Sequence, residues 1–148
     1  MSSPIRVLLV DDEVAFVKSL AKILVRKGME VQAAHEGSAA IELTSQEEFD
    51  AIVLDVRMPG MDGLAALEEI RKRDLLTPVL LLTGHIDLER TRQALKGGAT
   101  EIFLKPCPIE TLVSAIENAR EWKAIRQEVR DTSSREQGAQ KRRVPSRG

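Results

Sequence analysis

The sequence predicts an α/β protein with a doubly wound, five-stranded parallel sheet. Two observations lead to this fold class. Short, hydrophobic and β-prone runs alternate five times with segments in which apolar residues recur at helical spacing, and the connections between them are short. Helical crossovers between parallel strands are right-handed and cover both faces of the sheet. The strand order 2-1-3-4-5 is a common solution for five strands, and its crevice lies beside the first and third strands.

Five apolar runs predict the strands. The first, Ile5–Val10, is almost wholly apolar, as expected of a central strand that is covered on both faces. Met29–Ala34 is weaker, and Ala51–Leu54 is a second buried run that precedes a loop rich in proline and glycine. Two further runs complete the predicted sheet: Val79–Leu82 and Thr100–Leu104.

A helix is predicted after each strand, because apolar residues there lie three and four positions apart. The first helix, Glu13–Lys27, ends where Gly28 offers a C-terminal stop. The second and third are Ser38–Gln46, which is expected to turn Ile41 towards the sheet, and Leu64–Lys72.

The last two helices are predicted from a cap and from spacing. Asp87 is expected to cap the fourth helix, whose buried side would carry Leu88, Thr91 and Leu95. The fifth begins near Pro108, and its buried side would carry the residues at i, i+3, i+4 and i+7: Ile109, Leu112, Val113 and Ile116.

The end of the chain changes in character. Residues 1–126 are predicted to form one domain, and residues 127–148 a polar, disordered tail without aromatic residues. Residues 130–148 are therefore expected to be dispensable for folding. Ala119, Trp122, Ile125 and Val129 continue an apolar stripe, which has two interpretations. Either Trp122 packs on the domain and the rest frays, or the helix extends and pairs with another protomer. The first is favoured, because two turns without a sustained heptad do not make a coiled coil.

Composition excludes several classes of protein. The 148 residues carry a formal net charge of −1, with a basic tail on an acidic body, whereas a nucleic-acid binder would show a basic stripe on a folded face. The basic cluster Lys141, Arg142, Arg143 and Arg147 is interpreted as a solvated tail. Cys107 is the only cysteine, so no internal disulfide can form. Six largely apolar residues precede Asp11, too few for a signal peptide or a membrane span, so a soluble, cytoplasmic protein is expected.

Polar residues follow four of the predicted strands. Asp11 and Asp12, Asp55, Thr83 and Lys105 would converge at the carboxyl edge of a parallel sheet. Taken singly, each has a plain structural interpretation, such as a helix cap for the paired aspartates. Together, three carboxylates repel one another unless a cation compensates, and Mg²⁺ prefers oxygen ligands. Mg²⁺ and one ammonium would balance the three negative charges, which leaves a site suited to accept a phosphoryl group.

The motifs LLVDDE, IVLDVRMPGMDG, LLTGH and FLKP, in this order and spacing, resemble the receiver domain of two-component response regulators over roughly residues 4–122. The resemblance implies a flavodoxin-like (βα)5 fold and a phospho-accepting signalling domain, limited to self-phosphorylation and autodephosphorylation. By the same resemblance, Asp55 would accept a phosphoryl group from a sensor histidine kinase or a histidine phosphotransfer protein.

The resemblance also assigns the surrounding residues. Mg²⁺ would be held by Asp12, by Asp11 through water, by Asp55 and by the backbone carbonyl of Arg57. Thr83 and Lys105 would bind the phosphoryl oxygens, and the Lys105–Pro106 peptide bond would be cis.

The sequence departs from the family at several positions. Receivers often carry Tyr or Phe where this chain has Ile102, and Phe103 should point the opposite way because strand side chains alternate. Cys107 replaces a common Phe and is interpreted as a small buried side chain. Arg57 and His85 occupy positions that tune phosphoryl lifetime in this family, with His85 at the mouth of the site. No role is assigned to His35.

Alternative functions follow from the same features. The favoured one is a stand-alone receiver that switches protein–protein interactions, without direct DNA or membrane binding, as a monomer or weak homodimer. A receiver from a larger regulator that lacks its output domain is the second. An aspartate-nucleophile phosphatase would need a second aspartate where Arg57 stands. A nucleotide-binding flavodoxin-like protein would need a glycine-rich loop after the first strand.

Overall fold

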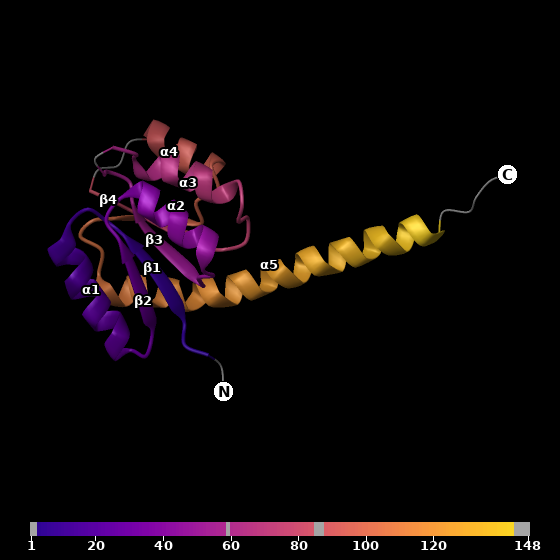
Figure 1. Cartoon of the computed structure of the whole chain (residues 1–148), viewed down its shortest axis with the longest axis horizontal. Helices are drawn as coiled ribbons and strands as arrows, with labels where there is room; N and C mark the ends of the chain where they lie inside the picture. The colour runs from indigo at the N-terminus through magenta and orange to yellow at the C-terminus, as the bar shows by residue number, and fades with distance from the viewer. Residues whose placement is uncertain (1–2, 59, 85–87, 144–148) are drawn as a thin grey trace.

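The computed structural model describes residues 3–58, 60–84 and 88–143, and its centre is a five-stranded parallel sheet with helices on both faces (Figure 1). The strand order is β2-β1-β3-β4-β5, so the predicted fold class and topology are confirmed. Each strand begins or ends within one residue of its predicted bounds: β1 (Arg6–Val10), β2 (Glu30–Ala34), β3 (Ala51–Asp55), β4 (Val79–Thr83) and β5 (Glu101–Leu104).

Two hydrophobic clusters hold the layers together, one on each face of the sheet. Val7 and Leu9 of β1 belong to the cluster under α1 (Val14–Arg26) and α5 (Ile109–Arg143). Leu8 and Val10 belong to the opposite cluster. That face is covered by three helices: α2 (Gly37–Gln46), α3 (Gly63–Arg71) and α4 (Leu88–Lys96). Helices cover both faces of the sheet, so the side chains on both faces of β1, β3 and β4 are buried, and these strands are almost continuously apolar.

The buried side of α4 differs from the predicted one. Leu88 and Leu95 are 67% and 55% exposed, whereas Ala94 is 2% exposed. The small side of the helix faces inward, where Ala94 belongs to the same hydrophobic cluster as Leu67 and Ile70 of α3. Periodicity shows that the helix has an apolar side but not which side packs. The predicted cap, Asp87, lies outside the described residues.

Helix α5 continues far beyond the predicted end of the domain. It runs without a break to Arg143, so the expected disorder is wrong for residues 127–143, while 144–148 lie outside the described residues. Arginine, glutamate and glutamine favour a helix here, and the next proline after Pro108 is Pro145. Gln127 also donates to Asp131 one turn later (3.4 Å). The favoured interpretation of Trp122 holds only in part: Trp122 lines a hollow of the domain with Leu80 and Ala115 but stays 55% exposed, and the helix beyond it does not fray. The domain boundary at residue 126 stays a prediction.

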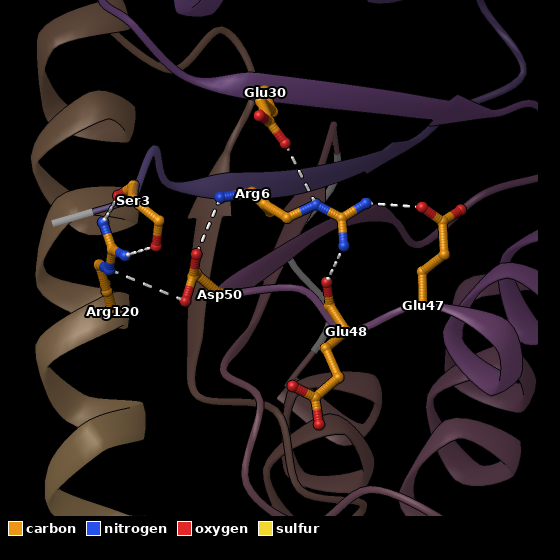
Figure 2. A network of polar contacts seen from close by, with 7 residues as sticks. All are labelled: Ser3, Arg6, Glu30, Glu47, Glu48, Asp50 and Arg120. Atoms are coloured by element: carbon orange, nitrogen blue, oxygen red, sulfur yellow. Dashed lines mark hydrogen bonds and ion pairs between the residues drawn. The ribbon is translucent and has the colours of Figure 1, made fainter.

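A polar network fixes the part of α5 around Arg120 at the amino edge of the sheet (Figure 2). Arg120 of α5 donates to the carbonyl and the hydroxyl of Ser3 and approaches Asp50 (4.0 Å). Asp50 in turn accepts a hydrogen bond from the backbone N–H of Arg6 (2.8 Å). The guanidinium of Arg6 pairs with Glu47 (2.6 Å) and also contacts Glu30 and the Glu48 carbonyl. These contacts join α5 to β1, β2 and the start of β3.

Within the part of the chain that the structure describes, no helix is both long and apolar enough to cross a bilayer.

Candidate functional site

The carboxyl edge of the sheet gathers the predicted site residues. Asp11 directly follows β1, Asp55 is the last residue of β3, and Thr83 is the last residue of β4. All three are buried, and the most accessible of them, Thr83, is only 7% exposed. In the β3–β4 pairing Asp55 lies opposite Leu82, and in the β4–β5 pairing Thr83 lies opposite Leu104. The register therefore brings Thr83 one step beyond Asp55, and Lys105 one step beyond β5.

Three carboxylates form a compact acidic cluster. One oxygen each from Asp11, Asp12 and Asp55 lies within 4.8 Å of the others. Asp11 and Asp55 are buried, while Asp12 is exposed, so the cluster opens to solvent on one side. Burial, together with the charge of Asp11, raises the pKa of Asp55 from 3.8 to about 6. The all-oxygen donor set fits a hard divalent cation, which would offset this repulsion.

Lys105 supplies the positive charge of the site. Its Nζ lies 2.8 Å from Asp11 Oδ2 and 3.6 Å from Asp55 Oδ1. Burial lowers the pKa of this ammonium, but the hydrogen bond to Asp11 and the charge of Asp55 outweigh burial and raise the pKa above its ordinary value. Its backbone N–H donates to the Thr83 carbonyl (2.7 Å), which ties the ends of β4 and β5 together. The Lys105–Pro106 peptide bond is cis, as the resemblance implied.

The segment after Asp55 is packed tightly against the strand end. The N–H of Arg57 approaches Asp55 Oδ1 (3.4 Å), and the N–H of Gly63 donates to the Val56 carbonyl (2.8 Å). Asp62 caps α3 by accepting from the N–H of Ala65 (2.8 Å). A Cβ at Gly63 would lie only 2.2 Å from the Asp55 carbonyl oxygen, so α3 begins directly against the backbone of Asp55.

Two neighbours of the site were not predicted. His35 follows β2, and its Nδ1 lies 3.0 Å from the Asp11 carbonyl. The rule that located the other residues, position just past a parallel strand, would also have located His35. Phe16 of α1 lies beneath Lys105, whose Nζ is 5.0 Å from the ring centroid. Its helical spacing indicated only a core residue, which gives no signal for a cation–π contact.

Ile102 and Phe103, which depart from the family pattern, lie on opposite faces of the sheet. Ile102 packs in the cluster under α2, α3 and α4, and Phe103 packs in the opposite cluster, so the predicted opposition of these side chains is confirmed. Ile102 and Thr83 line a small cavity of about 50 Å³ together with Arg57 and Arg90. His85 lies outside the described residues.

Cys107 is less enclosed than predicted. Its side chain is half-buried at the edge of the α1/α5 cluster, where the thiol is 3.6 Å from the Pro108 carbonyl. Burial raises the pKa of the thiol above its ordinary value, which disfavours the reactive thiolate form.

Comparisons with known proteins agree with this geometry. The family model for the response regulator receiver domain matches residues 7–117. The regulatory protein AtoC of Escherichia coli is 33% identical over 125 residues, which are 84% of this chain but 27% of AtoC. The transcriptional regulatory protein TrcR of Mycobacterium tuberculosis is 39% identical over 114 residues, or 77% of this chain and 44% of TrcR. This chain thus spans less than half the length of either relative.

Solved structures point the same way. A CheY-like response regulator receiver domain protein from Methanospirillum hungatei superposes with a TM-score of 0.81 at 27% identity, covering 84% of this chain and 99% of that one. A receiver domain protein from Clostridium thermocellum gives a TM-score of 0.77 at 31% identity, covering 82% of this chain and 98% of that one.

Proposed function

This chain belongs to the response regulator receiver domain family of two-component systems, and from that premise we propose that it takes up a phosphoryl group on Asp55. Phosphorylation on aspartate is typical of the family. The single observation that carries the assignment to Asp55 is its position in the acidic cluster, 3.6 Å from the Lys105 ammonium, at the end of the central strand β3.

The proposed reaction is an in-line transfer. A carboxylate oxygen of Asp55 attacks the phosphorus of the donor, an O–P bond forms, and the P–N bond of a phosphohistidine breaks with its electron pair returning to the imidazole. Lys105 neutralises charge on the transferred oxygens, and the Thr83 hydroxyl donates to one of them. Mg²⁺ held by Asp11, Asp12, Asp55 and the Arg57 carbonyl would supply further charge neutralisation.

The consequence for signalling follows from the surroundings of Thr83. A phosphoryl group adds acceptor oxygens next to the carboxyl end of β4, and these would draw in the Thr83 hydroxyl and the segment that follows it. Thr83 borders the cavity beneath α4, where Arg90 pairs with Asp62 of the α3 cap (3.2 Å). We infer that a stand-alone receiver uses this surface to switch contacts with a downstream protein in the cytoplasm.

A second candidate role rests on the lengths of the relatives. The matched regions make up 27% of AtoC and 44% of TrcR, so this chain could equally serve as the receiver module of a larger regulator. Phosphotransfer profiling against the histidine kinases of the host would identify the donor in either case. An output domain encoded in the same reading frame would favour the second role.

Phosphoryl uptake by the full chain is expected to depend on a divalent cation. Incubation with acetyl phosphate and Mg²⁺ should give a slower-migrating, hydroxylamine-sensitive species on Phos-tag gels, because an aspartyl phosphate is an acyl phosphate. Excess EDTA should abolish that species, since three crowded carboxylates are left without their counter-ion. Equal labelling with and without metal, or no labelling with either acetyl phosphate or a purified kinase, would contradict the proposal.

Asp12→Ala is expected to remove the stabilisation by Mg²⁺ while leaving the fold intact. In the wild type, Mg²⁺ at ten times its dissociation constant should add about 1.4 kcal/mol to the free energy of unfolding, which is several degrees in Tm. The metal-free variant should melt at or slightly above the wild-type Tm, because one of three repelling carboxylates is gone. Glu13→Ala, the adjacent exposed carboxylate, is the matched control and should keep the Mg²⁺ shift. If Mg²⁺ raises the Tm of Asp12→Ala as much as it raises that of the wild type, Asp12 is not a ligand of the metal.

A further inference from the structure

Lys105 has an aromatic ring beneath its ammonium as well as carboxylates beside it. Its Nζ lies over the ring of Phe16, 5.0 Å from the centroid, while Asp11 Oδ2 is 2.8 Å away. The side chain of Lys105 is only 22% exposed, so the ring and the carboxylates replace most of the water around it. The chain carries three phenylalanines, one tryptophan and no tyrosine, so a ring at this position is not a consequence of a high aromatic content.

Packing alone does not require a ring at position 16. The buried side of α1 is made by Val17, Leu20 and Leu24, whereas Phe16 is half-buried and packs against the same cluster from outside. An aliphatic side chain would cover the cluster there as well. It would not provide the negative face of an aromatic ring, which attracts a cation that lies within about 6 Å of the centroid.

The ring differs from a carboxylate in what it leaves on the ammonium. Asp11 makes the short contact with Lys105, and Asp55 Oδ1 stays at 3.6 Å, which is longer than a hydrogen bond. A further carboxylate beneath the ammonium would neutralise its charge and take one of its N–H donors. A ring face attracts the ammonium through its quadrupole and carries no net charge, so the positive charge stays available to a group added at Asp55.

We propose that Phe16 is a positioning residue for Lys105: its ring face holds the ammonium beside Asp11 and Asp55 and keeps water from its underside. Lysine has a flexible four-carbon stem, so without the ring the ammonium would spend more time in solvent. The effect on phosphoryl transfer rests on the function proposed above, in which Lys105 acts on the transferred oxygens. The hold on Lys105 does not rest on it, because the contact is present in the unphosphorylated chain.

Fluorination of the ring tests the contact without removing the side chain. Replacing Phe16 by 3,4,5-trifluorophenylalanine withdraws electron density from the ring face and changes its size little. The initial rate of labelling by acetyl phosphate in saturating Mg²⁺ should fall about threefold to tenfold, and singly and doubly fluorinated rings should give rates in between. An equal rate across the series would overturn the proposal, because the hold on Lys105 would not depend on the ring face.

Phe49 is the matched control for this series. Its ring also lies under a cation, the guanidinium of Arg6 at 5.2 Å, but at the opposite edge of the sheet, just before β3 begins. The same fluorination there should leave the labelling rate unchanged, although it weakens a cation–π contact of similar length. An equal fall of the rate at both positions would show that the loss comes from lower stability of the whole domain, and this would also overturn the proposal.

Thermal unfolding in EDTA supplies a readout that needs no phosphoryl transfer. Trifluorination of Phe16 should change the Tm of the wild type by about 2–4 °C more, in the downward direction, than it changes the Tm of Lys105→Met. The neutral methionine is insensitive to the charge of the ring face. The hydrophobicity that fluorine adds acts equally in both backgrounds and cancels in the comparison. The same change in both backgrounds would contradict a hold on Lys105.

The two readouts separate this inference from the proposed function. If no variant is labelled but the Tm change depends on Lys105, phosphoryl uptake at Asp55 is wrong and the hold of Phe16 on Lys105 stands. If the wild type is labelled, and neither the rate nor the Tm comparison responds to fluorination, the function stands and Phe16 is a packing residue only.

Discussion

Asp55→Asn is expected to abolish phosphoryl uptake from acetyl phosphate and, at the same time, to stabilise the metal-free protein above pH 6. An amide cannot ionise to the carboxylate that attacks phosphorus. The gain in stability has a separate cause, because burial and Asp11 raise the pKa of Asp55 to about 6 in the folded chain. The unfolded chain keeps the ordinary value of 3.8, so the folded state binds the proton more tightly than the unfolded state does.

The sign and pH window follow directly. The contribution of Asp55 to the free energy of unfolding of the wild type is greatest below pH 4, where Asp55 is neutral in both states. This contribution is lost as the pH rises to about 6. The variant cannot carry the buried charge, so its advantage should grow across that window to about 1–3 kcal/mol, at 1.36 kcal/mol per pKa unit. Urea unfolding in EDTA at pH 4 and pH 8 measures the difference between the two proteins.

Two controls separate loss of the acceptor from loss of the fold. Asp50→Asn changes the aspartate just before the other end of β3 and should still be phosphorylated. Asp55→Asn itself should remain folded by its melting curve. Labelling of Asp55→Asn would show that another residue accepts the phosphoryl group. A variant less stable than wild type at pH 8 would show that the ion pair of Asp55 with Lys105 outweighs the burial cost.

Gly63→Ala is expected to destabilise the protein by about 3 kcal/mol. Helix propensity alone predicts the opposite sign, since alanine is favoured over glycine by about 1 kcal/mol inside a helix. The structure decides against propensity because the added Cβ would lie 2.2 Å from the Asp55 carbonyl oxygen and 2.8 Å from the Val56 Cα. These are backbone atoms, which cannot rotate away, so α3 or the end of β3 must move.

The same substitution should also affect the site. Movement of the Asp55 backbone would misplace its carboxylate, so labelling by acetyl phosphate should fall together with stability. Gly84→Ala is the matched control, because nothing lies within 4 Å of the Cβ position there and no positive φ is involved. Denaturant unfolding of the three proteins gives the comparison. A Gly63→Ala variant as stable as Gly84→Ala would show that the strand end and α3 are not locked together.

The position of the proposed acceptor site could be predicted because it depends on where strands end. Asp55, Thr83 and Lys105 follow apolar runs that have clear limits in the sequence. Parallel topology then requires the ends of those strands to share one edge. The cis Lys105–Pro106 bond and the opposition of Ile102 and Phe103 were likewise predictable from the motif and from strand alternation.

Other features needed the tertiary structure. The residues around Leu88, Ala94 and Leu95 fit a helix, but only the packing of Ala94 in the cluster that contains Leu67 shows that the small side of α4 is the buried one. The proximity of His35 to the Asp11 carbonyl and of Phe16 to Lys105 joins elements whose separation in sequence carries no signal.

Helix α5 shows the division most clearly. Its sequence by itself determined the periodic stripe through Trp122, Ile125 and Val129 and the good helix formers beyond it. Only the tertiary structure decided how much of that stripe is covered: Trp122 lines a hollow beside Glu101 of β5, whereas Ile125 and Val129 are 49% and 63% exposed. The physical reason is that periodicity records which side of a helix is apolar, whereas the surface that covers that side depends on segments far away in the chain.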